Sequence, residues 1–160
     1  MSFAPVFDKR ARILIVGTYP SPASLETGFY YGHPANRFWR LMASVLESEI
    51  PCTVPQKKKL LLDHFIALWD VLDRCDITGA ADATIRNGLP NHLPGLLDKS
   101  EITAVFANGA AAARLTDRYF KGRIAQPVYR LPSTSPANAA YSFERLFKEW
   151  VSIRRYLILY

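Results

Sequence analysis

Cysteine and histidine are scarce in this 160-residue sequence, and so are the patterns in which they bind metals. The two cysteines, Cys52 and Cys75, belong to no CxxC pair and have no histidine at ligand spacing. A zinc site or a four-cysteine iron–sulfur cluster therefore lacks its ligands within one chain. We expect two reduced thiols partly packed in a core, with no bound metal and no cofactor.

Long apolar stretches are missing too. No segment reaches the roughly 18 consecutive apolar residues that a membrane-spanning helix needs. Residues 13–16 are apolar and follow three basic residues, but the turn-forming residues 17–20 end the run, which argues against a secretory signal. The chain is 49% hydrophobic and 21% charged, a composition that excludes a disordered protein. We therefore expect one intracellular, cytoplasmic domain over residues 1–160, without membrane contact.

The fingerprints of several common enzyme classes are also absent. The sequence contains neither GxxxxGK[ST] nor GxGxxG, which disfavours an NTPase or a nicotinamide enzyme. It contains no GxSxG elbow, so a serine hydrolase that would use Ser133 and His33 has no support from spacing.

Positive charge is concentrated in the second half of the chain. The net charge is +6; residues 1–80 hold nine basic and eight acidic groups, whereas residues 81–160 hold eleven and six. A basic C-terminal half fits a polyanionic partner such as nucleic acid. Many small domains are equally basic without binding one, so charge alone leaves both interpretations open.

Short apolar runs alternate with helical periodicity along the chain. Four runs predict buried strands, at residues 11–17, 65–69, 102–107 and 128–131. Helices are predicted at residues 37–46, 60–64, 109–119 and 139–156. Strands that alternate with helices indicate an α/β fold with helices on both faces of a parallel sheet.

The ligand of such a sheet binds beyond the carboxyl ends of its strands, and two loops follow strands there. Residues 17–36 give about twenty residues without regular structure, a length typical of functional loops. Phe29, Tyr30 and Tyr31 are adjacent in this loop, which cannot bury all three. We expect some of these rings to stack on a nucleobase and at least one to plug the sheet edge.

The second loop carries three hydroxyl side chains, Ser133, Thr134 and Ser135, between two prolines and ahead of a helix. Hydroxyl groups and backbone N–H groups near a helix N-terminus are natural phosphate ligands. Helix capping would explain one or two of the three residues.

Three segments together carry a family resemblance: GTYPS at 17–21, GFYYGHPANRFW at 28–39 and LPSTSPAN at 131–138. They resemble the uracil-DNA glycosylase superfamily, and within it most closely the hypoxanthine-DNA (deoxyinosine) glycosylase branch. The resemblance extends over essentially the whole chain. It implies a three-layer αβα sandwich with a central four-stranded parallel sheet, in agreement with the pattern of strands and helices.

The resemblance also implies roles for single residues. Asn36 matches the asparagine that orients the attacking water in the hypoxanthine branch, and Tyr31 matches the aromatic residue on which the flipped base stacks. Tyr19 stands where mismatch-specific uracil enzymes have an asparagine. Leu131 replaces the histidine that stabilises charge on the departing base in efficient uracil enzymes. Both replacements argue against fast uracil excision.

His33 is a second catalytic candidate, because a neutral imidazole has one donor and one acceptor and could assist the leaving group. A structural histidine that bonds to its own loop is the alternative. The residues expected to bind the base are Gly17, Thr18, Tyr19, Phe29, Tyr31 and Asn108. The residues expected to contact the DNA are Ser21, Pro132, Ser133, Thr134, Ser135 and Asn138.

The function implied by the resemblance is a monofunctional DNA glycosylase. It would flip a deaminated base, chiefly hypoxanthine, out of double-stranded DNA and hydrolyse its N-glycosidic bond, leaving an abasic site in base excision repair. The enzyme would act as a monomer at the nucleoid. The alternatives are a mismatch-type uracil or xanthine glycosylase of broad base range, a non-catalytic damaged-DNA-binding module, and a hydrolase of free nucleosides.

Two sets of charged residues outside these motifs are expected to have structural roles. The three aspartates within residues 70–76, Asp70 among them, surround Arg74 and are expected to form a capping and ion-pair cluster. Asp82 and Arg86 are spaced for a surface ion pair on one helical turn.

Overall fold

The computed structural model describes residues 2–78 and 85–157. Asp82 and its expected pairing with Arg86 lie outside these residues. A parallel sheet in the order β2-β1-β5-β6 forms the centre of the fold. Its strands are β1 (Ile13–Gly17), β2 (Ile66–Asp70), β5 (Ala104–Asn108) and β6 (Val128–Leu131). The four predicted strands are confirmed, with ends that differ by at most two residues from those expected.

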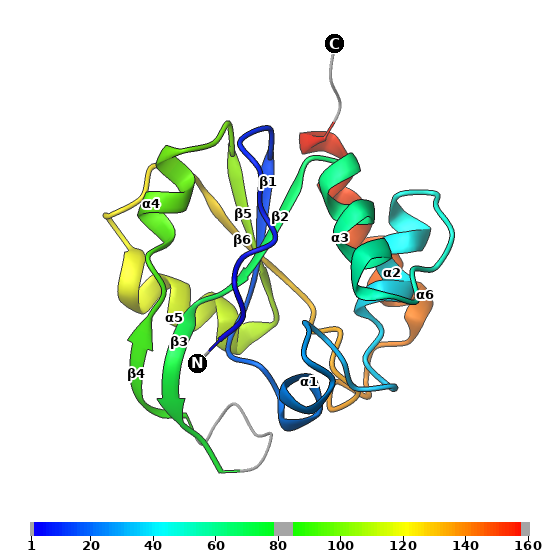
Figure 1. The fold of residues 1–160 in the computed structure, drawn as a ribbon, viewed down its shortest axis with the longest axis horizontal. Helices are drawn as coiled ribbons and strands as arrows, with labels where there is room; N and C mark the ends of the chain where they lie inside the picture. The colour runs from blue at the N-terminus through cyan, green and yellow to red at the C-terminus, as the bar shows by residue number, and fades with distance from the viewer. Residues whose placement is uncertain (1, 79–84, 158–160) are drawn as a thin grey trace.

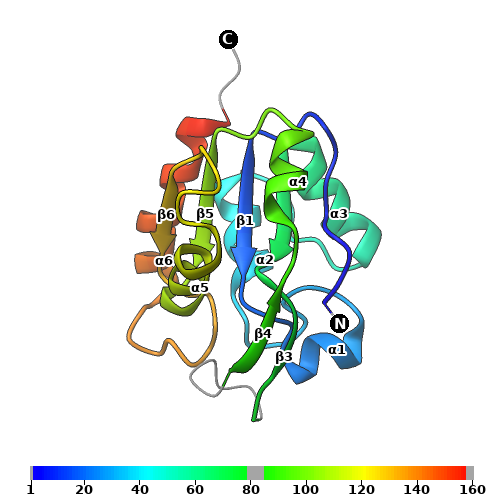
Figure 2. The same cartoon turned by 90° about the vertical axis from the view of Figure 1, so that its left-hand side faces the viewer.

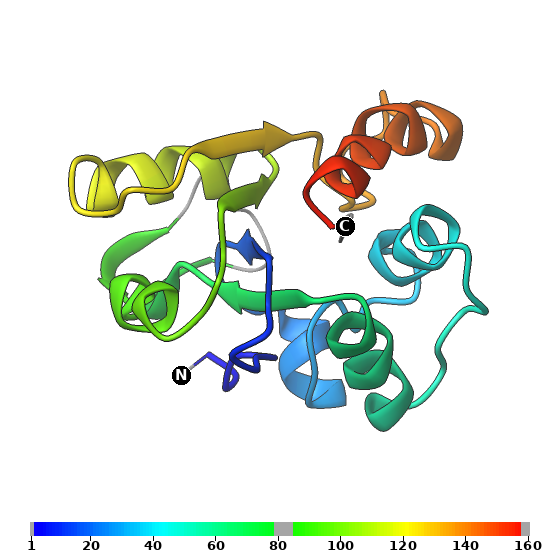
Figure 3. The same ribbon diagram turned by 90° about the horizontal axis from the view of Figure 1, so that it is seen from above.

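Helices cover both faces of the sheet, as Figures 1 and 3 show. One layer contains α2 (Phe38–Val45), α3 (Val54–Asp63) and α6 (Phe143–Trp150), and the other contains α4 (Leu93–Asp98) and α5 (Ala110–Phe120). This arrangement confirms the predicted three-layer αβα sandwich with a four-stranded parallel sheet.

The central strand β1 explains why its sequence is apolar without a break. Ile13 and Ile15 pack into the layer of α2, α3 and α6, whereas Leu14 and Val16 pack into the layer of α4 and α5. All four side chains are completely buried. A strand covered on both faces needs apolar residues at every position rather than at every second one.

Several helix predictions are wrong at their ends. Helix α3 begins at Val54, six residues before the predicted start, because Thr53 and Gln56 form a capping box. The last helix begins only at Phe143, where Ser142 caps it, and continues after Trp150 as the tighter 3₁₀ helix η2 (Val151–Tyr156). The sequence pattern also missed α4 and the antiparallel hairpin of β3 (Leu72–Asp76) and β4 (Arg86–Pro90), whose side chains are largely exposed.

The prediction of an irregular loop over residues 17–36 is wrong, because this segment contains the helix α1 (Pro22–Thr27). Ser21 Oγ accepts the Ser24 N–H at 3.1 Å and caps the first turn. Pro22 occupies the first turn and Gly28 ends the helix with a φ of 83°. Proline at the start and glycine after the end are the usual asymmetry of helix boundaries.

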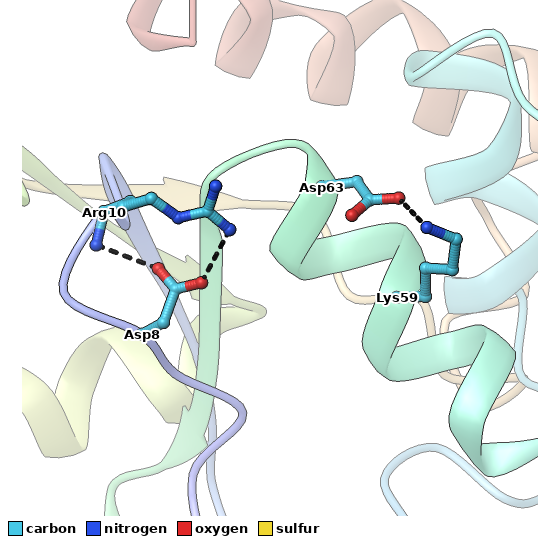
Figure 4. Close-up of polar contacts among 4 residues, drawn as sticks. All are labelled: Asp8, Arg10, Lys59 and Asp63. Atoms are coloured by element: carbon cyan, nitrogen blue, oxygen red, sulfur yellow. Dashed lines mark hydrogen bonds and ion pairs between the residues drawn. The ribbon is translucent and has the colours of Figure 1, made fainter.

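Surface charges pair locally. Asp8 bonds to Arg10 at 3.0 Å and Asp63 to Lys59 at 2.7 Å (Figure 4). The hydrogen bond from Lys59 lowers the pKa of Asp63. Both pairs are exposed, so they contribute little to the free energy of unfolding.

The two cysteines are free thiols in different surroundings. Cys75 is partly buried against the α4/α5 layer, but Cys52 is exposed, so the prediction that both thiols are partly packed is wrong for Cys52. In the described part of the chain, no helix combines the length and the apolar character needed to cross a membrane.

Candidate active site

A cavity of about 440 Å³ opens at the carboxyl edge of the sheet. Three strands deliver their last residues to it: β1 ends at Gly17, β2 at Asp70 and β5 at Asn108. Helix α1 and the loop after β6 complete its walls, and Figure 2 shows β1 pointing towards this end of the molecule. The site therefore lies where the rule for parallel sheets predicts a ligand.

Most of the predicted site residues border this cavity. They are Gly17, Thr18, Tyr19, Ser21, Tyr31, His33, Asn36, Asn108, Ser133, Thr134 and Ser135. Phe29, Pro132 and Asn138 do not border it. Asp70 borders it without having been predicted.

A chain of hydrogen bonds joins the ends of β5 and β6 to the HPANRFW segment. Thr134, which is fully buried, exchanges two bonds with Asn108: its N–H donates to Asn108 Oδ1 at 3.0 Å, and its Oγ1 accepts from Asn108 Nδ2 at 3.1 Å. Thr134 Oγ1 also donates to Asn36 Oδ1 at 2.9 Å. The N–H of Phe38 donates to the same Asn36 oxygen at 2.9 Å. These contacts hold Asn36 at the cavity wall.

Arg37 holds the hydroxyl-rich loop in place. Its guanidinium donates to the carbonyl oxygens of Ser135 at 2.9 Å, Asn138 at 3.1 Å, Thr134 at 3.4 Å and Tyr141. Its backbone N–H donates to the Thr134 carbonyl at 3.1 Å. A planar fork of five N–H donors is suited to bind several carbonyl groups at once.

Tyr31 stands beside the cavity in an unusual backbone conformation, with a φ of +53°. Its ring stacks on Phe38 at a centroid distance of 4.2 Å. Gly17 lies under it: a Cβ at this position would be 2.9 Å from the Tyr31 hydroxyl oxygen and 2.6 Å from Asp70 Oδ1. A Cβ at position 17 would therefore displace the ends of the Asp70 and Tyr31 side chains, so glycine keeps both in place where β1 enters the site.

Asp70 is buried at the end of β2 and borders the cavity. Within the expected cluster, Arg74 approaches Asp73 at 3.8 Å, and Asp76 accepts from Asn87 at 2.7 Å. A sequence signal for Asp70 existed, because the residue directly follows an apolar strand of a parallel sheet. The rule that ligands bind beyond the carboxyl ends of parallel strands would have placed Asp70 in the site.

Phe29 is a core residue, so its prediction as a base-binding residue is wrong. Its side chain is only 7% exposed and stacks on Trp39 at 6.0 Å. Tyr30 is also buried, and its hydroxyl donates to the Ala4 carbonyl at 2.9 Å. Burial raises the pKa of Tyr30. The loop therefore buries two of its three adjacent aromatic rings, and both Tyr30 and Tyr31 border the cavity.

Three other predicted residues have local structural partners. His33 is exposed at the cavity, and its Nδ1 accepts the Ala35 N–H at 3.0 Å, so the neutral ring carries its proton on Nε2. The Pro132 carbonyl accepts from Trp150 Nε1 at 2.9 Å. Asn138 Nδ2 donates to the Ser133 carbonyl at 3.0 Å. Pro132 and Asn138 thus shape the loop behind the cavity wall.

Tyr19 and Leu131 mark the positions where the resemblance departs from the uracil enzymes. Burial first, and then the nearby Cys75 and Asp73, raise the pKa of Tyr19, which keeps the phenol protonated as a neutral donor. Leu131 is buried and does not border the cavity. Over residues 2–78 and 85–157, no three His, Cys, Asp or Glu side chains gather where they could hold a metal ion.

Fold and site together define an α/β protein with a cavity, lined by aromatic and hydroxyl side chains among others, at the carboxyl edge of a four-stranded parallel sheet. The family model of the uracil DNA glycosylase superfamily matches residues 4–154. The chain therefore belongs to the uracil DNA glycosylase superfamily. It is an enzyme of the DNA glycosylase class, which hydrolyses N-glycosyl compounds.

Two curated relatives are named hypoxanthine DNA glycosylase. The protein from Methanosarcina acetivorans is 31% identical over 156 residues, which cover 96% of this chain and 97% of the relative. The protein from Methanosarcina barkeri is 34% identical over 109 residues, 67% of this chain and 69% of the relative. A solution NMR structure of a candidate uracil DNA glycosylase from M. acetivorans matches with a TM-score of 0.84 and 31% identity, over 97% of this chain and 96% of that chain.

Proposed function

We propose that this chain is a monofunctional DNA glycosylase that removes a deaminated base, chiefly hypoxanthine, from double-stranded DNA. The observation that carries the proposal is the cavity in which Asn36, Tyr31 and the hydroxyl-rich loop meet. The two relatives named hypoxanthine DNA glycosylase support the choice of base. The enzyme would work in base excision repair, inside the cell at the nucleoid, as a single-domain monomer without a cofactor.

The target nucleotide has to leave the duplex, because its N-glycosidic bond cannot be reached inside the stack. Rotating it out costs about a few kcal/mol, and less for a badly paired deaminated base. Contacts to the DNA phosphates offset this cost. Ser133 Oγ and Ser135 Oγ each accept a backbone N–H at 3.1 Å, from Ser135 and Ala137 respectively. Their hydroxyl hydrogens can therefore donate to a phosphate oxygen.

The cavity offers different groups to the face and the edge of a base. Tyr31 has one ring face against Phe38 and borders the cavity, which suits stacking of a flipped base. Asp70 has carboxyl oxygens that can accept from the N1–H of hypoxanthine. Adenine has a bare nitrogen at that position, which a carboxylate would repel. Asp70 would thus favour the deaminated base over its parent.

Hydrolysis then replaces the bond between C1′ and the base nitrogen by a bond between C1′ and water oxygen. The electron pair of the broken bond goes to the base, and the base takes up the proton that the water releases. Donors in the cavity favour the negative charge on the departing base. The described residues that border the cavity include no lysine to form a Schiff base. The product would be an abasic site.

Single-turnover cleavage of labelled duplexes tests this proposal. The duplexes would carry deoxyinosine, deoxyuridine or deoxyxanthosine, with alkali added afterwards to break abasic sites. Strong cutting at inosine and weak cutting at uracil is expected, whereas equal cutting would indicate the broad-range alternative. Tight binding without cutting would indicate a damage-binding module, and equal cleavage of free deoxyinosine would indicate a nucleoside hydrolase.

The Asn36→Ala variant tests the site itself. It should abolish excision and keep DNA binding, since only one amide is removed from the cavity wall. Asn87→Ala, in the exposed β4 strand outside the cavity, is the matched control and should cleave like the wild type. Normal turnover by Asn36→Ala would remove Asn36 from the mechanism.

A further inference from the structure

Two backbone N–H groups fix the orientation of two side-chain amides at the cavity. The Phe38 N–H meets the Asn36 amide at 2.9 Å, and the Thr134 N–H meets the Asn108 amide at 3.0 Å. A backbone N–H can only donate, so the atom that it meets is the amide oxygen in both cases. With either amide turned around, two donors would face each other.

The hydroxyl of Thr134 carries this polarity from one amide to the other. Asn108 Nδ2 can only donate, so Thr134 Oγ1 accepts from it at 3.1 Å. The hydroxyl hydrogen is then directed to Asn36 Oδ1, at 2.9 Å. Together with the bond from Phe38, this contact uses both lone pairs of the Asn36 oxygen.

Only the NH₂ group of Asn36 is left to act on a ligand. Among the residues that the structure describes, Asn36 Nδ2 donates to no protein group, and the side chain borders the cavity. We propose that Thr134 is a positioning residue that holds the Asn36 amide with its NH₂ group towards the cavity, and that Asn36 acts in excision as a hydrogen-bond donor, not as an acceptor. This proposal rests on the glycosylase function proposed above.

A donor at this position has two uses in the reaction. One N–H can bind an acceptor atom of the departing base and stabilise the electron pair that it receives. The other can bind the oxygen of the attacking water and leave a lone pair of that oxygen for C1′. Leu131 supplies no polar group to the cavity, so the Asn36 NH₂ group would take over charge stabilisation on the base. Asn36 itself gains and loses no proton.

Thr134 is well placed for this role because solvent cannot replace it. Its side chain is 0% exposed, between Asn108 and Asn36. Replacing the hydroxyl by a methyl group in Thr134→Val keeps the volume and leaves both amides one partner short. The Asn36 amide would then be held by the Phe38 N–H alone, and its NH₂ group could shift away from the position that it needs for the reaction.

The first arm of the test tells donor from acceptor. The wild type must cleave deoxyinosine duplexes; if it does not, the proposed function fails and not this inference. Asn36→Asp keeps an acceptor for the Phe38 N–H and the Thr134 hydroxyl but removes the NH₂ group. Its single-turnover rate should fall by about a hundredfold to a thousandfold, as after loss of a donor that stabilises a leaving anion. An Asn36→Asp enzyme that cleaves at nearly the wild-type rate would overturn the assignment.

The second arm tests whether Thr134 acts through Asn36. Thr134→Val should lower the single-turnover rate by about tenfold to a hundredfold, the effect of a small misplacement, with unchanged duplex affinity. Thr134→Ser should restore the rate. In an Asn36→Asp background, which keeps a residual rate but has no NH₂ group to position, Thr134→Val should have no further effect, and an equal loss in both backgrounds would refute the positioning role. Thermal unfolding checks that each variant is folded. If Thr134→Val does not fold, the single-turnover rates of Thr134→Ser and Asn36→Asp still test the proposal.

Discussion

Arg37 gives the most direct test of how the site is held together. Its guanidinium donates to four carbonyl groups of the segment 134–141, which carries Ser135, one of the two serines proposed to bind phosphate. Arg37→Met keeps most of the apolar stem and removes every one of these donors. Arg37→Lys keeps the charge but has a single ammonium group in place of the planar fork.

The size of the effect follows from these contacts. A hydrogen bond that involves a charged group contributes about 1.5–3 kcal/mol, but the carbonyls of a surface loop find water when the arginine is lost. We therefore expect Arg37→Met to lower the free energy of unfolding by about 3 kcal/mol. In a domain of this size each kcal/mol shifts Tm by about 2–4 °C, so the expected shift is about 6–12 °C. Arg37→Lys should lose about half as much.

Differential scanning calorimetry measures these shifts, and single-turnover cleavage at a temperature where all variants are folded measures the effect on excision. Arg40→Met is the matched control, because Arg40 lies three residues further along, is exposed in the first turn of helix α2, and has a cation–π contact with Phe143 at 5.5 Å. Its Tm should stay near that of the wild type. An Arg37→Met protein that is no less stable than Arg40→Met, and as active, would refute the assigned role.

Further predictions concern substitutions at five single positions. Gly17→Ala should lower the excision rate at least tenfold and cost about 1–3 kcal/mol of stability, because its Cβ would overlap Asp70 and the Tyr31 hydroxyl; paired unfolding and cleavage assays check this. Phe29→Ala should lose about 3–5 kcal/mol in urea unfolding but keep its activity when folded, whereas Tyr31→Ala should mainly lose excision. Asp70→Leu should lower deoxyinosine cleavage about tenfold to a hundredfold, and an unchanged rate would exclude Asp70 from base reading. Burial raises the pKa of Tyr30, so this phenol ionises first in the unfolded chain, and the free energy of unfolding falls as the pH rises above about 10. In urea unfolding from pH 8 to 12, the free energy of unfolding of Tyr30→Phe should fall less steeply than that of the wild type. An equal slope in both proteins would contradict this.

The sheet and the position of the site could be predicted from sequence for one physical reason. Strands buried on both faces have uninterrupted apolar runs, and the loops that follow such strands converge at one edge. Residues 17–21 and 131–138 both follow strands of this kind, β1 and β6. The hairpin of β3 and β4 has no apolar run, because its side chains are mostly exposed, and it could not be found in this way.

The errors at the site have a different cause. Phe29 and Tyr30 do lie in an irregular segment, but this segment follows the helix α1 and packs into the core. Helix α1 is only six residues long and shows no apolar periodicity, so the sequence pattern misses it. The sequence signal for this helix was the proline and the glycine at its two ends, Pro22 and Gly28. The contact between Asn108 and Thr134 joins side chains 26 residues apart, and no local pattern indicates such a pair. Thr134 was therefore predicted as a DNA contact, although its side chain is buried.

The chain of bonds from Asn108 through Thr134 to Asn36 also determines when activity can arise during folding. Its members come from the end of β5, the loop after β6 and the segment before α2. No fragment that lacks the last strand can close this chain, so a partly synthesised or C-terminally truncated protein would have the sheet centre without a working site. Catalytic competence would then appear in one step with the docking of β6, and a refolding experiment that follows cleavage and secondary structure together would record that coincidence.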